Sequence, residues 1–240
     1  MRTTTKSFVL ALPGLFALLV SFGCSDIAVN PHADGFNTGV NGTQDVKASE
    51  PFHYTVDLAS QHTLKVEGIN GAVNVESVSG TNRVTISGEK IVGSETYSDA
   101  RESLKNLSVV IDELSNELVV KTVQPEYMDG RNYNVNYTIT IPSNLSVDVK
   151  NVNGKLSSEV SVPISGTVDL HSTNGSIELQ IPQNTSAEFS ASLENGKISV
   201  RHISLFSRIE TSKSLRGTFG GGEGAISLRT TNGNIDVIGF

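Results

Sequence analysis

Asparagine–glycine pairs recur through the chain at a fixed spacing. Gly154, Gly175 and Gly196 each follow an Asn and are separated from one another by 21 residues. Another 21 residues lead to Gly217, which follows an arginine instead. A constant period of this length indicates a repeated supersecondary unit. The pairs whose flanking residues keep the same phase are Asn70-Gly71, Asn153-Gly154, Asn174-Gly175, Asn195-Gly196 and Asn232-Gly233.

Apolar residues alternate around these glycines. Val168 lies seven residues before Gly175 and Ile177 lies two after it, and the other units repeat this phase. Alternation with period two is typical of a strand with one buried face. Each unit is therefore predicted to form a strand, an Asn-Gly turn and a second strand. Around Gly217 the phase slips by one residue, which predicts a degenerate unit with a loop at Gly220–Gly224.

Two all-β architectures fit this pattern. One is an antiparallel β-sandwich of Asn-Gly hairpins, because this dipeptide is a strong hairpin signal. The other is a single β-solenoid in which each unit of ~21 residues forms one rung with Asn-Gly at its corner, where the Asn side chains hydrogen-bond from rung to rung. The constant phase favours the solenoid, because each rung must cover the core of its neighbour. It predicts that Val147, Val168 and Phe189 stack in adjacent strands.

The stretch between the first two Asn-Gly pairs is less regular. Tyr97, Ala100, Leu104 and Leu107 have helical spacing, which predicts one short amphipathic helix over residues 96–107 with Ser98 as its cap. This helix is expected to cover a face or an open end of the repeats, since exposed terminal strands invite aggregation. Further strands are expected at Leu107–Ile111, Leu118–Val123 and Val135–Ile141.

The first 23 residues have the pattern of an export signal. Arg2 and Lys6 precede an apolar run, Phe8–Phe22, that is too short for a membrane-spanning helix of ~20 residues. This pattern predicts a signal peptide over residues 1–23. The only cysteine, Cys24, follows directly and excludes an intramolecular disulfide.

The position of Cys24 resembles the lipobox of bacterial lipoproteins. That resemblance implies a diacylglycerol on Cys24 and a membrane link through this lipid anchor; ordinary secretory cleavage before Cys24 is the alternative. Ser25, in place of the Asp that signals inner-membrane retention in that family, implies the outer membrane. Residues 24–50 are polar and aperiodic, which predicts a lipidated N-terminus and flexible tether ahead of a β-strand-repeat domain over 51–240.

The charge of the chain disfavours nucleic acid as a partner. Eighteen Lys and Arg stand against 25 Asp and Glu, a net charge of −7. Removing residues 1–23 removes Arg2 and Lys6 and no acid, so 16 basic residues remain against 25 acidic ones, a net charge of −9. Proteins that track a phosphate backbone need a basic surface instead.

Few residues suggest chemistry. The five histidines show no metal-ligand spacing, so no metal, cofactor or catalytic residue is predicted. Asp148 and Asp169 share one phase and should stack one strand spacing, ~4.8 Å, apart. Tyr127 and Tyr133 flank the Asp129-Gly130 turn and are candidate binding residues for a sugar or a protein, because exposed aromatic rings stack well. Tyr137 shares a face with apolar neighbours and is assigned to the core.

The order of these parts resembles a known group. The string YTITIPSNLSVDVKNVNGKL (Tyr137–Leu156) followed by tandem V-x-L-x-x-x-N-G-x-I-x-L units is similar to the bacterial putative-adhesin family of β-strand-repeat domains, over residues 52–240. The resemblance implies export, a repetitive β fold and often a lipoprotein signal, and carries over no catalytic residue.

These observations lead to one principal hypothesis. The chain is expected to be a lipid-anchored cell-envelope protein whose repetitive β surface serves adhesion, binding or scaffolding without catalysis, with a glycan or an envelope protein as partner. A polysaccharide-active β-helix enzyme and an envelope-stress accessory protein are the alternatives.

Overall fold

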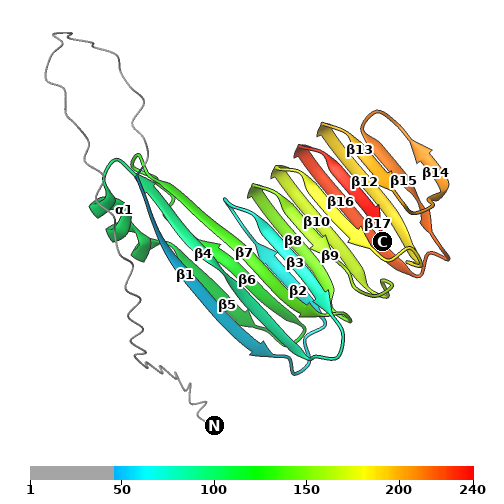
Figure 1. Ribbon diagram of the computed structural model, residues 1–240, viewed down its shortest axis with the longest axis horizontal. Coiled ribbons are helices and arrows are strands. Elements are labelled where there is room, and N and C mark those ends of the chain that lie inside the picture. Colours follow the sequence, from blue (N-terminus) through cyan, green and yellow to red (C-terminus); the bar gives the residue numbers. More distant parts are fainter. Residues whose placement is uncertain (1–45) are drawn as a thin grey trace, which may run out of the picture. The chain divides into compact units, whose positions relative to one another are not determined.

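A computed structural model of the protein describes residues 46–240. They form an all-β structure of two mixed sheets, neither of which closes on itself. Figure 1 shows the strands stacked side by side along the domain. The first sheet has the order β1 (Val46–Asp57), β4 (Arg83–Ser94), β7 (Asn132–Pro142), β3 (Val73–Val78), β9 (Leu156–Glu159), β11 (Ile177–Ile181), β17 (Ile235–Gly239) and β13 (Ile198–Arg201).

The second sheet carries the partner strand of each repeat. Its order is β14 (Phe206–Glu210), β15 (Ser214–Phe219), β12 (Ala187–Asn195), β16 (Gly224–Asn232), β10 (Thr167–Asn174), β8 (Ser146–Asn153), β2 (Thr63–Glu67), β6 (Glu117–Val123) and β5 (Ser108–Glu113). Inward side chains of both sheets form one hydrophobic core. The alternation predicted from the sequence is therefore confirmed, as the burial pattern of β10 illustrates.

Each Asn-Gly pair connects a strand of the second sheet to a strand of the first. In the unit around Gly175, β10 leads into β11, and the two strands pair with other units rather than with each other. The Asn-Gly pairs are thus corners between sheets and not two-residue hairpin turns. Strands of neighbouring units run parallel and in register, so Val168 lies beside Val147.

The order of the units differs from their order in the sequence. Val168 pairs with Ile226, and Ile226 pairs with Phe189. The expectation that Val168 and Phe189 lie in adjacent strands is therefore wrong, because the β16–β17 unit lies between them. Identical phase makes every unit an acceptable neighbour for every other, so the phase alone does not fix the order.

Antiparallel strands flank the repeats at both ends. At one end β1 pairs with β4 and β4 with β7, and β5 pairs with β6. At the other end β14 and β15 form a hairpin whose second strand lies antiparallel to β12. Gly217 lies inside β15 and not at a corner, which corrects the degenerate unit predicted there. The first strand begins at Val46, so strand replaces residues 46–50 of the predicted tether.

The predicted helix is present but shorter. Helix α1 (Tyr97–Ser103) continues into a 3₁₀ turn, η1 (Leu104–Asn106), and packs against β1 and β4. Its cap is Thr96, whose side chain accepts a hydrogen bond from the Asp99 amide, and not Ser98. Within residues 46–240 no helix is long and apolar enough to cross a membrane.

The corner glycines are required by close contact between rungs. Gly154 has φ +130°, and a Cβ there would lie 2.1 Å from the carbonyl oxygen of Gly71. The same contact recurs at the later corners. A Cβ built on Gly175, Gly233 or Gly196 would lie similarly close to the glycine carbonyl oxygen of the preceding corner in space. Real Cβ atoms do not approach backbone oxygens so closely, so each corner admits only glycine.

The corner asparagines form a hydrogen-bonded ladder, as predicted. The amide nitrogen of Asn153 donates to Oδ1 of Asn70 at 2.7 Å, and Asn174 donates to Asn153 at 2.9 Å. Asn232 donates to Asn174 at 2.7 Å, and Asn195 donates to Asn232 at 2.8 Å. We call these five residues the asparagine ladder. It follows the spatial order of the units rather than their order in the chain.

Candidate binding surface

A row of basic side chains crosses the outward face of the second sheet. Lys150 on β8 pairs in register with His171 on β10, and His171 pairs with Arg229 on β16. Neighbouring strands lie ~4.8 Å apart, so the three side chains leave the sheet at that repeat distance. We call Lys150, His171 and Arg229 the basic row.

Acidic side chains lie beside part of the basic row: Glu67 on β2 pairs in register with Lys150, and Asp148 lies two residues before it on β8. Lys150 Nζ lies 3.6 Å from Asp148 Oδ2, a long ion pair between partly exposed side chains. Arg229 makes no ion pair among the described residues. Ion pairs between exposed side chains are weak, so an anion in solution can compete with Asp148 for Lys150. Arg229 is available to such an anion without competition from an ion pair.

The predicted stacking of Asp148 and Asp169 is confirmed, because the two residues pair in register across β8 and β10. Lys65 on β2 flanks Asp148 on its other side. Lys65 also binds Glu67 at 3.0 Å, which raises the pKa of the Lys65 ammonium and lowers the pKa of the Glu67 carboxyl. Within residues 46–240 no three His, Cys, Asp or Glu side chains meet as a metal site would require.

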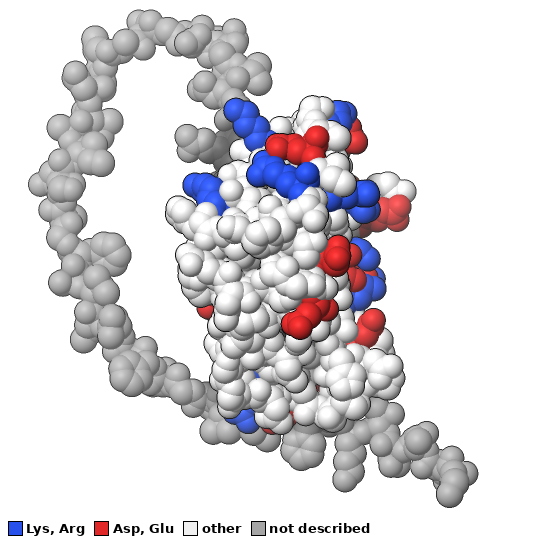
Figure 2. Space-filling view, turned by 90° about the vertical axis from the view of Figure 1, so that its right-hand side faces the viewer, with Lys and Arg blue, Asp and Glu red and all other residues white. Residues whose placement is uncertain are grey.

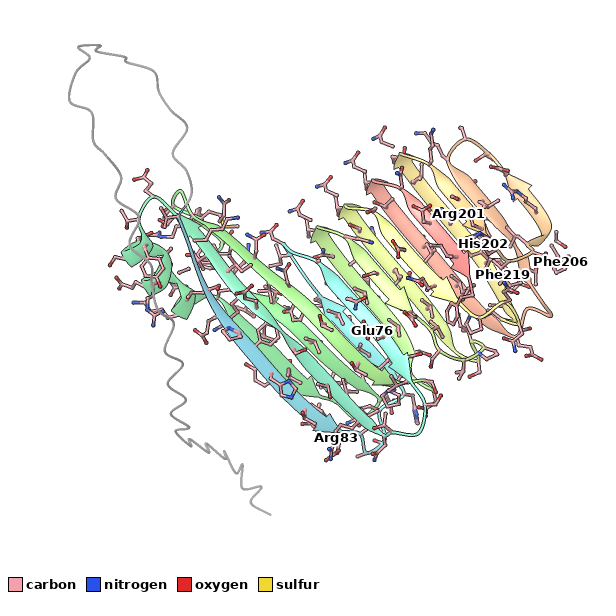
Figure 3. All side chains as sticks on the ribbon, viewed as in Figure 1. Glu76, Arg83, Arg201, His202, Phe206 and Phe219 are labelled. Atoms are coloured by element: carbon pink, nitrogen blue, oxygen red, sulfur yellow. The ribbon has the colours of Figure 1, made fainter. Side chains whose placement is uncertain are left out.

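The outward face of the first sheet carries acidic residues next to basic ones. Glu76 pairs in register with Glu159, and Glu178 pairs with Asp236. Lys155 binds Glu178 at 2.8 Å and lowers the pKa of that carboxyl, and Arg201 binds Asp236 at 3.5 Å. Glu76 and Arg201 are labelled in Figure 3. The basic groups Lys155 and Arg201 on this side of the domain are therefore engaged in ion pairs, whereas Arg229 in the basic row forms none in the described part of the chain.

The two tyrosines predicted to bind a ligand have different environments. Tyr127 is 77% exposed in the connection between β6 and β7 and remains available to a partner. Tyr133 is 2% exposed, because it points inward from β7, which corrects its predicted position at the surface. Tyr137 belongs to the core as predicted, and burial raises the pKa of its hydroxyl to about 12.

Arg131 and Asp99 hold the region of Tyr127 against helix α1. Arg131 donates from Nε and Nη2 to the two Asp99 oxygens, both at 2.7 Å, and Ser94 also donates to Asp99. Bidentate pairs of this kind fix geometry as well as charge. The Arg131 guanidinium lowers the pKa of Asp99 to about 2.

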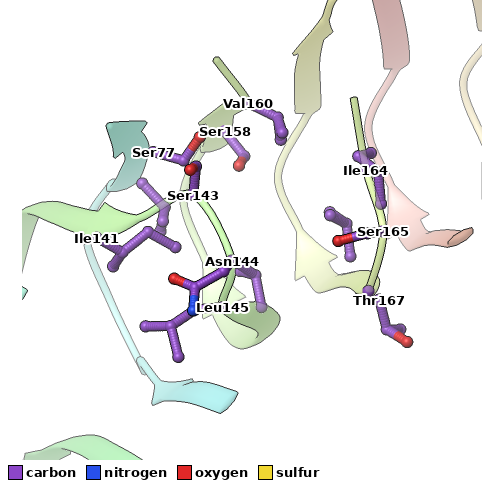
Figure 4. A pocket seen from close by; sticks show the side chains of 14 residues that line it. Ser77, Ile141, Ser143, Asn144, Leu145, Ser158, Val160, Ile164, Ser165 and Thr167 are labelled. Atoms are coloured by element: carbon purple, nitrogen blue, oxygen red, sulfur yellow. The ribbon is translucent and has the colours of Figure 1, made fainter. Parts of the chain in front are cut away.

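A small cavity lies between the β3, β9 and β10 units and the loop after β9. Its volume is about 20 Å³, and its wall includes Ser158, Val160 and Ile164 (Figure 4). Ser158 is 3% exposed and pairs in register with Val75 and Leu179, which are both apolar. The cavity has room for about one water molecule. It is too small to receive a sugar or a peptide side chain.

The end of the domain that holds β14 carries exposed apolar side chains. Figure 2 views the end that holds β13 and β14, where charged side chains lie mainly over the upper and right-hand parts of the face. Phe206 is 58% exposed and Ile209 is 66% exposed on β14. Phe206 projects at the outer edge in Figure 3, whereas Phe219 is buried against Phe189.

Sequence reasoning identified the corners but missed the basic row. Lys150, His171 and Arg229 each lie four residues before a corner glycine, so the phase that revealed the core also contained this signal. Cys24, the predicted signal peptide and residues 24–45 of the predicted tether lie outside the described residues.

Comparisons with known proteins identify a family. A family model described as Toastrack DUF4097 matches residues 43–238. A solved putative cell adhesion protein from Clostridium sporogenes shows 11% identity and a TM-score of 0.44, covering 80% of this chain and 100% of that one. A putative adhesin from Parabacteroides distasonis shows 13% identity and a TM-score of 0.26, covering 81% and 71%. No curated protein matches the sequence.

Proposed function

The chain belongs to the Toastrack DUF4097 family, and we propose that it is a cell-envelope binding protein that holds an extended acidic glycan along the second sheet. The basic row carries this proposal. It offers Lys150, His171 and Arg229 at a regular spacing on one flat face. A polymer with repeated carboxylate or sulfate groups can contact several of these side chains at once, which adds weak contacts into useful affinity.

The scaffold that we propose for this surface is a β-solenoid with rungs of ~21 residues. Its support is the parallel, in-register pairing of the repeat strands and the asparagine ladder at their corners. A rigid scaffold of stacked rungs keeps the spacing of the basic row constant, so the side chains need little ordering when a ligand binds.

Binding is tested with the purified full chain and a panel of acidic and neutral glycans. The variant Lys150→Gln/Arg229→Gln should weaken binding to acidic glycans by about tenfold, the change that 1.4 kcal/mol produces. Rising salt should weaken binding by the wild type as well. Neutral glycans should bind less well than acidic ones of the same backbone.

The matched control is Lys155→Gln/Arg201→Gln, which changes a residue directly before β9 and the last residue of β13 on the side of the first sheet. It changes the net charge by the same amount but leaves the basic row intact, so it should retain binding. Equal loss in both double variants would contradict a site on the second sheet. Following the same glycans for cleavage tests the alternative of a polysaccharide-active enzyme.

We also propose that a lipid on Cys24 holds the domain at the cell envelope, in the outer membrane. The support is the sequence alone: an apolar run that ends at Phe22, followed by Gly23 and the only cysteine. Each buried acyl CH₂ contributes about 0.8 kcal/mol to membrane binding. Metabolic labelling with a radioactive fatty acid should mark the wild type and not Cys24→Ala. Label that persists in Cys24→Ala, or is absent from both, would overturn the lipid anchor.

A further inference from the structure

The backbone amides of the corner glycines are fixed by hydrogen bonds at every corner except one. Each amide donates to the asparagine carbonyl oxygen of the next rung at 2.9 Å, from Gly71 to Asn153, Gly154 to Asn174, Gly175 to Asn232 and Gly233 to Asn195. The Gly196 amide has no acceptor within residues 46–240, because its unit is the last in the spatial order of corners.

The side chain of Asn195, which precedes Gly196, is also less constrained. In the asparagine ladder, Oδ1 of every member except Asn195 accepts an amide hydrogen from the next rung. Asn195 donates to Asn232, but its own Oδ1 receives no donor in the described part of the chain. Gly196 is exposed, whereas the other four corner glycines are half-buried.

This difference matters for the chemistry of asparagine. In an Asn-Gly pair, the glycine nitrogen can lose its proton and attack the asparagine Cγ, because glycine has no side chain to obstruct the approach. The new N–Cγ bond closes a succinimide ring, and the side-chain nitrogen (Nδ2) of the asparagine leaves as ammonia. One water molecule then opens the ring to aspartate or isoaspartate, so the reaction needs no oxidant or other co-reactant.

A hydrogen-bonded glycine amide resists this attack. Its proton is held by an acceptor, and its nitrogen cannot turn toward Cγ without opening the corner. The Asn side chain at such a corner is held on both sides by the ladder. Four corners therefore protect an otherwise labile dipeptide, and the corner of Asn195 and Gly196 lacks that protection.

We propose that Asn195 is the site at which the folded domain deamidates. The product carries a carboxylate that cannot donate, so the hydrogen bond from residue 195 to Asn232 Oδ1 is lost and a negative charge takes its place. Isoaspartate additionally inserts a methylene into the backbone of the corner. The change acts on the end of the ladder and leaves the bonds among Asn70, Asn153, Asn174 and Asn232 intact.

The proposal is tested by incubating the full chain in mildly alkaline buffer and following each Asn-Gly peptide by mass spectrometry. The same chain in denaturant gives the unprotected rate for every pair, and Asn41-Gly42, outside the described residues, is followed in its own peptide. In the folded protein, Asn195 should react close to its unprotected rate. Asn153 and Asn174 should react at least about tenfold more slowly than theirs, the factor that opening a corner at a cost of about 1.4 kcal/mol implies.

The variant Asn195→Gln provides the control. It should remove the modified species from the peptide that contains residue 195 while leaving the slow rates at Asn153 and Asn174 unchanged. The proposal is overturned if Asn195 is protected as strongly as the other ladder residues, if a hydrogen-bonded corner reacts faster, or if no corner of the folded protein reacts.

Discussion

The side-chain amide of Asn70 donates a hydrogen bond to the backbone carbonyl oxygen of Tyr133 at 3.0 Å. That carbonyl can only accept, so Asn70 must direct its NH₂ group toward it and its Oδ1 toward Asn153. The same choice is then imposed on each later member, which gives the asparagine ladder one direction. Tyr133 thus acts on the repeats through its backbone, whereas its side chain belongs to the core.

Interior members of the ladder should contribute more to stability than its last member. Asn174 donates to Asn153 and accepts from Asn232, whereas Asn195 makes only one ladder bond. Asn174→Ala should lower the free energy of unfolding by about 1–3 kcal/mol and Asn195→Ala by about half of that. Denaturant titrations measure both, and equal losses would contradict a contribution that depends on the number of ladder bonds.

Substitution of a corner glycine should be severe. In Gly154→Ala the new Cβ would lie 2.1 Å from the Gly71 carbonyl oxygen, at a φ of +130°. We expect a loss of more than about 2 kcal/mol, or failure to fold. Gly80→Ala is the control, because Gly80 also has positive φ but nothing lies within 4 Å of its Cβ position. Its cost should be about 1 kcal/mol, from the backbone conformation alone.

Filling the small cavity should stabilise the domain. Ser158 is a buried serine beside Val75 and Leu179, and it lines a cavity of about 20 Å³. Ser158→Val should raise the free energy of unfolding by up to about 1 kcal/mol, because it fills space and removes a buried hydroxyl. Ser157→Val on the outward face of the same strand should give no such gain. A loss in Ser158→Val would indicate that the hydroxyl is essential to packing.

The ion pair of Asp99 and Arg131 should make the stability of the folded protein depend on pH in the acidic range. The pKa of Asp99 falls from 3.8 to about 2 in the folded protein. A lowered folded pKa stabilises the native state above the unfolded value, and this contribution is lost as pH falls toward the folded value. The difference in Tm between wild type and Asp99→Asn should therefore be constant near neutral pH, shrink below about pH 4 and vanish near pH 2.

A second pair provides the comparison for that experiment. Asp57 and Arg83 form a more exposed ion pair at 2.7 Å, and Arg83 lowers the pKa of Asp57. Because solvent screens exposed pairs, Asp57→Asn should change Tm less than Asp99→Asn at every pH. High salt should reduce both differences. A larger effect at Asp57 would contradict the argument that the less exposed pair of Asp99 and Arg131 is the stronger one.

Much of the fold could be predicted because the apolar residues keep fixed positions relative to the glycine of each repeat. The strands, the inward residues, the stacked corner asparagines and the family resemblance are all confirmed. The order of units could not be predicted, since parallel units with one phase fit beside one another in any order. The helix cap was misplaced because Thr96 and Ser98 are both good capping residues, and only the backbone shows that Thr96 is extended.

The candidate site was harder to predict than the fold. Tyr133 and Tyr127 both flank a turn, but strand β7 begins at Asn132 and turns the Tyr133 ring inward. The basic row could not be recognised as a motif because its members differ in residue type. The lysine, the histidine and the arginine share only their position four residues before a corner glycine. A search by phase for charge, and not only for apolar residues, would have found it.

The position of the β16–β17 unit has a consequence for how the protein is made. Strand β16 lies between β10 and β12 in the second sheet, and β17 lies between β11 and β13 in the first, so both lie between strands that the ribosome completes earlier. Until these two strands emerge, the units of β10 and β12 lack their shared neighbour and expose open strand edges. The domain can therefore reach its native stacking only after nearly all of the repeat region has been synthesised, which places its cooperative folding after synthesis of this segment rather than during it.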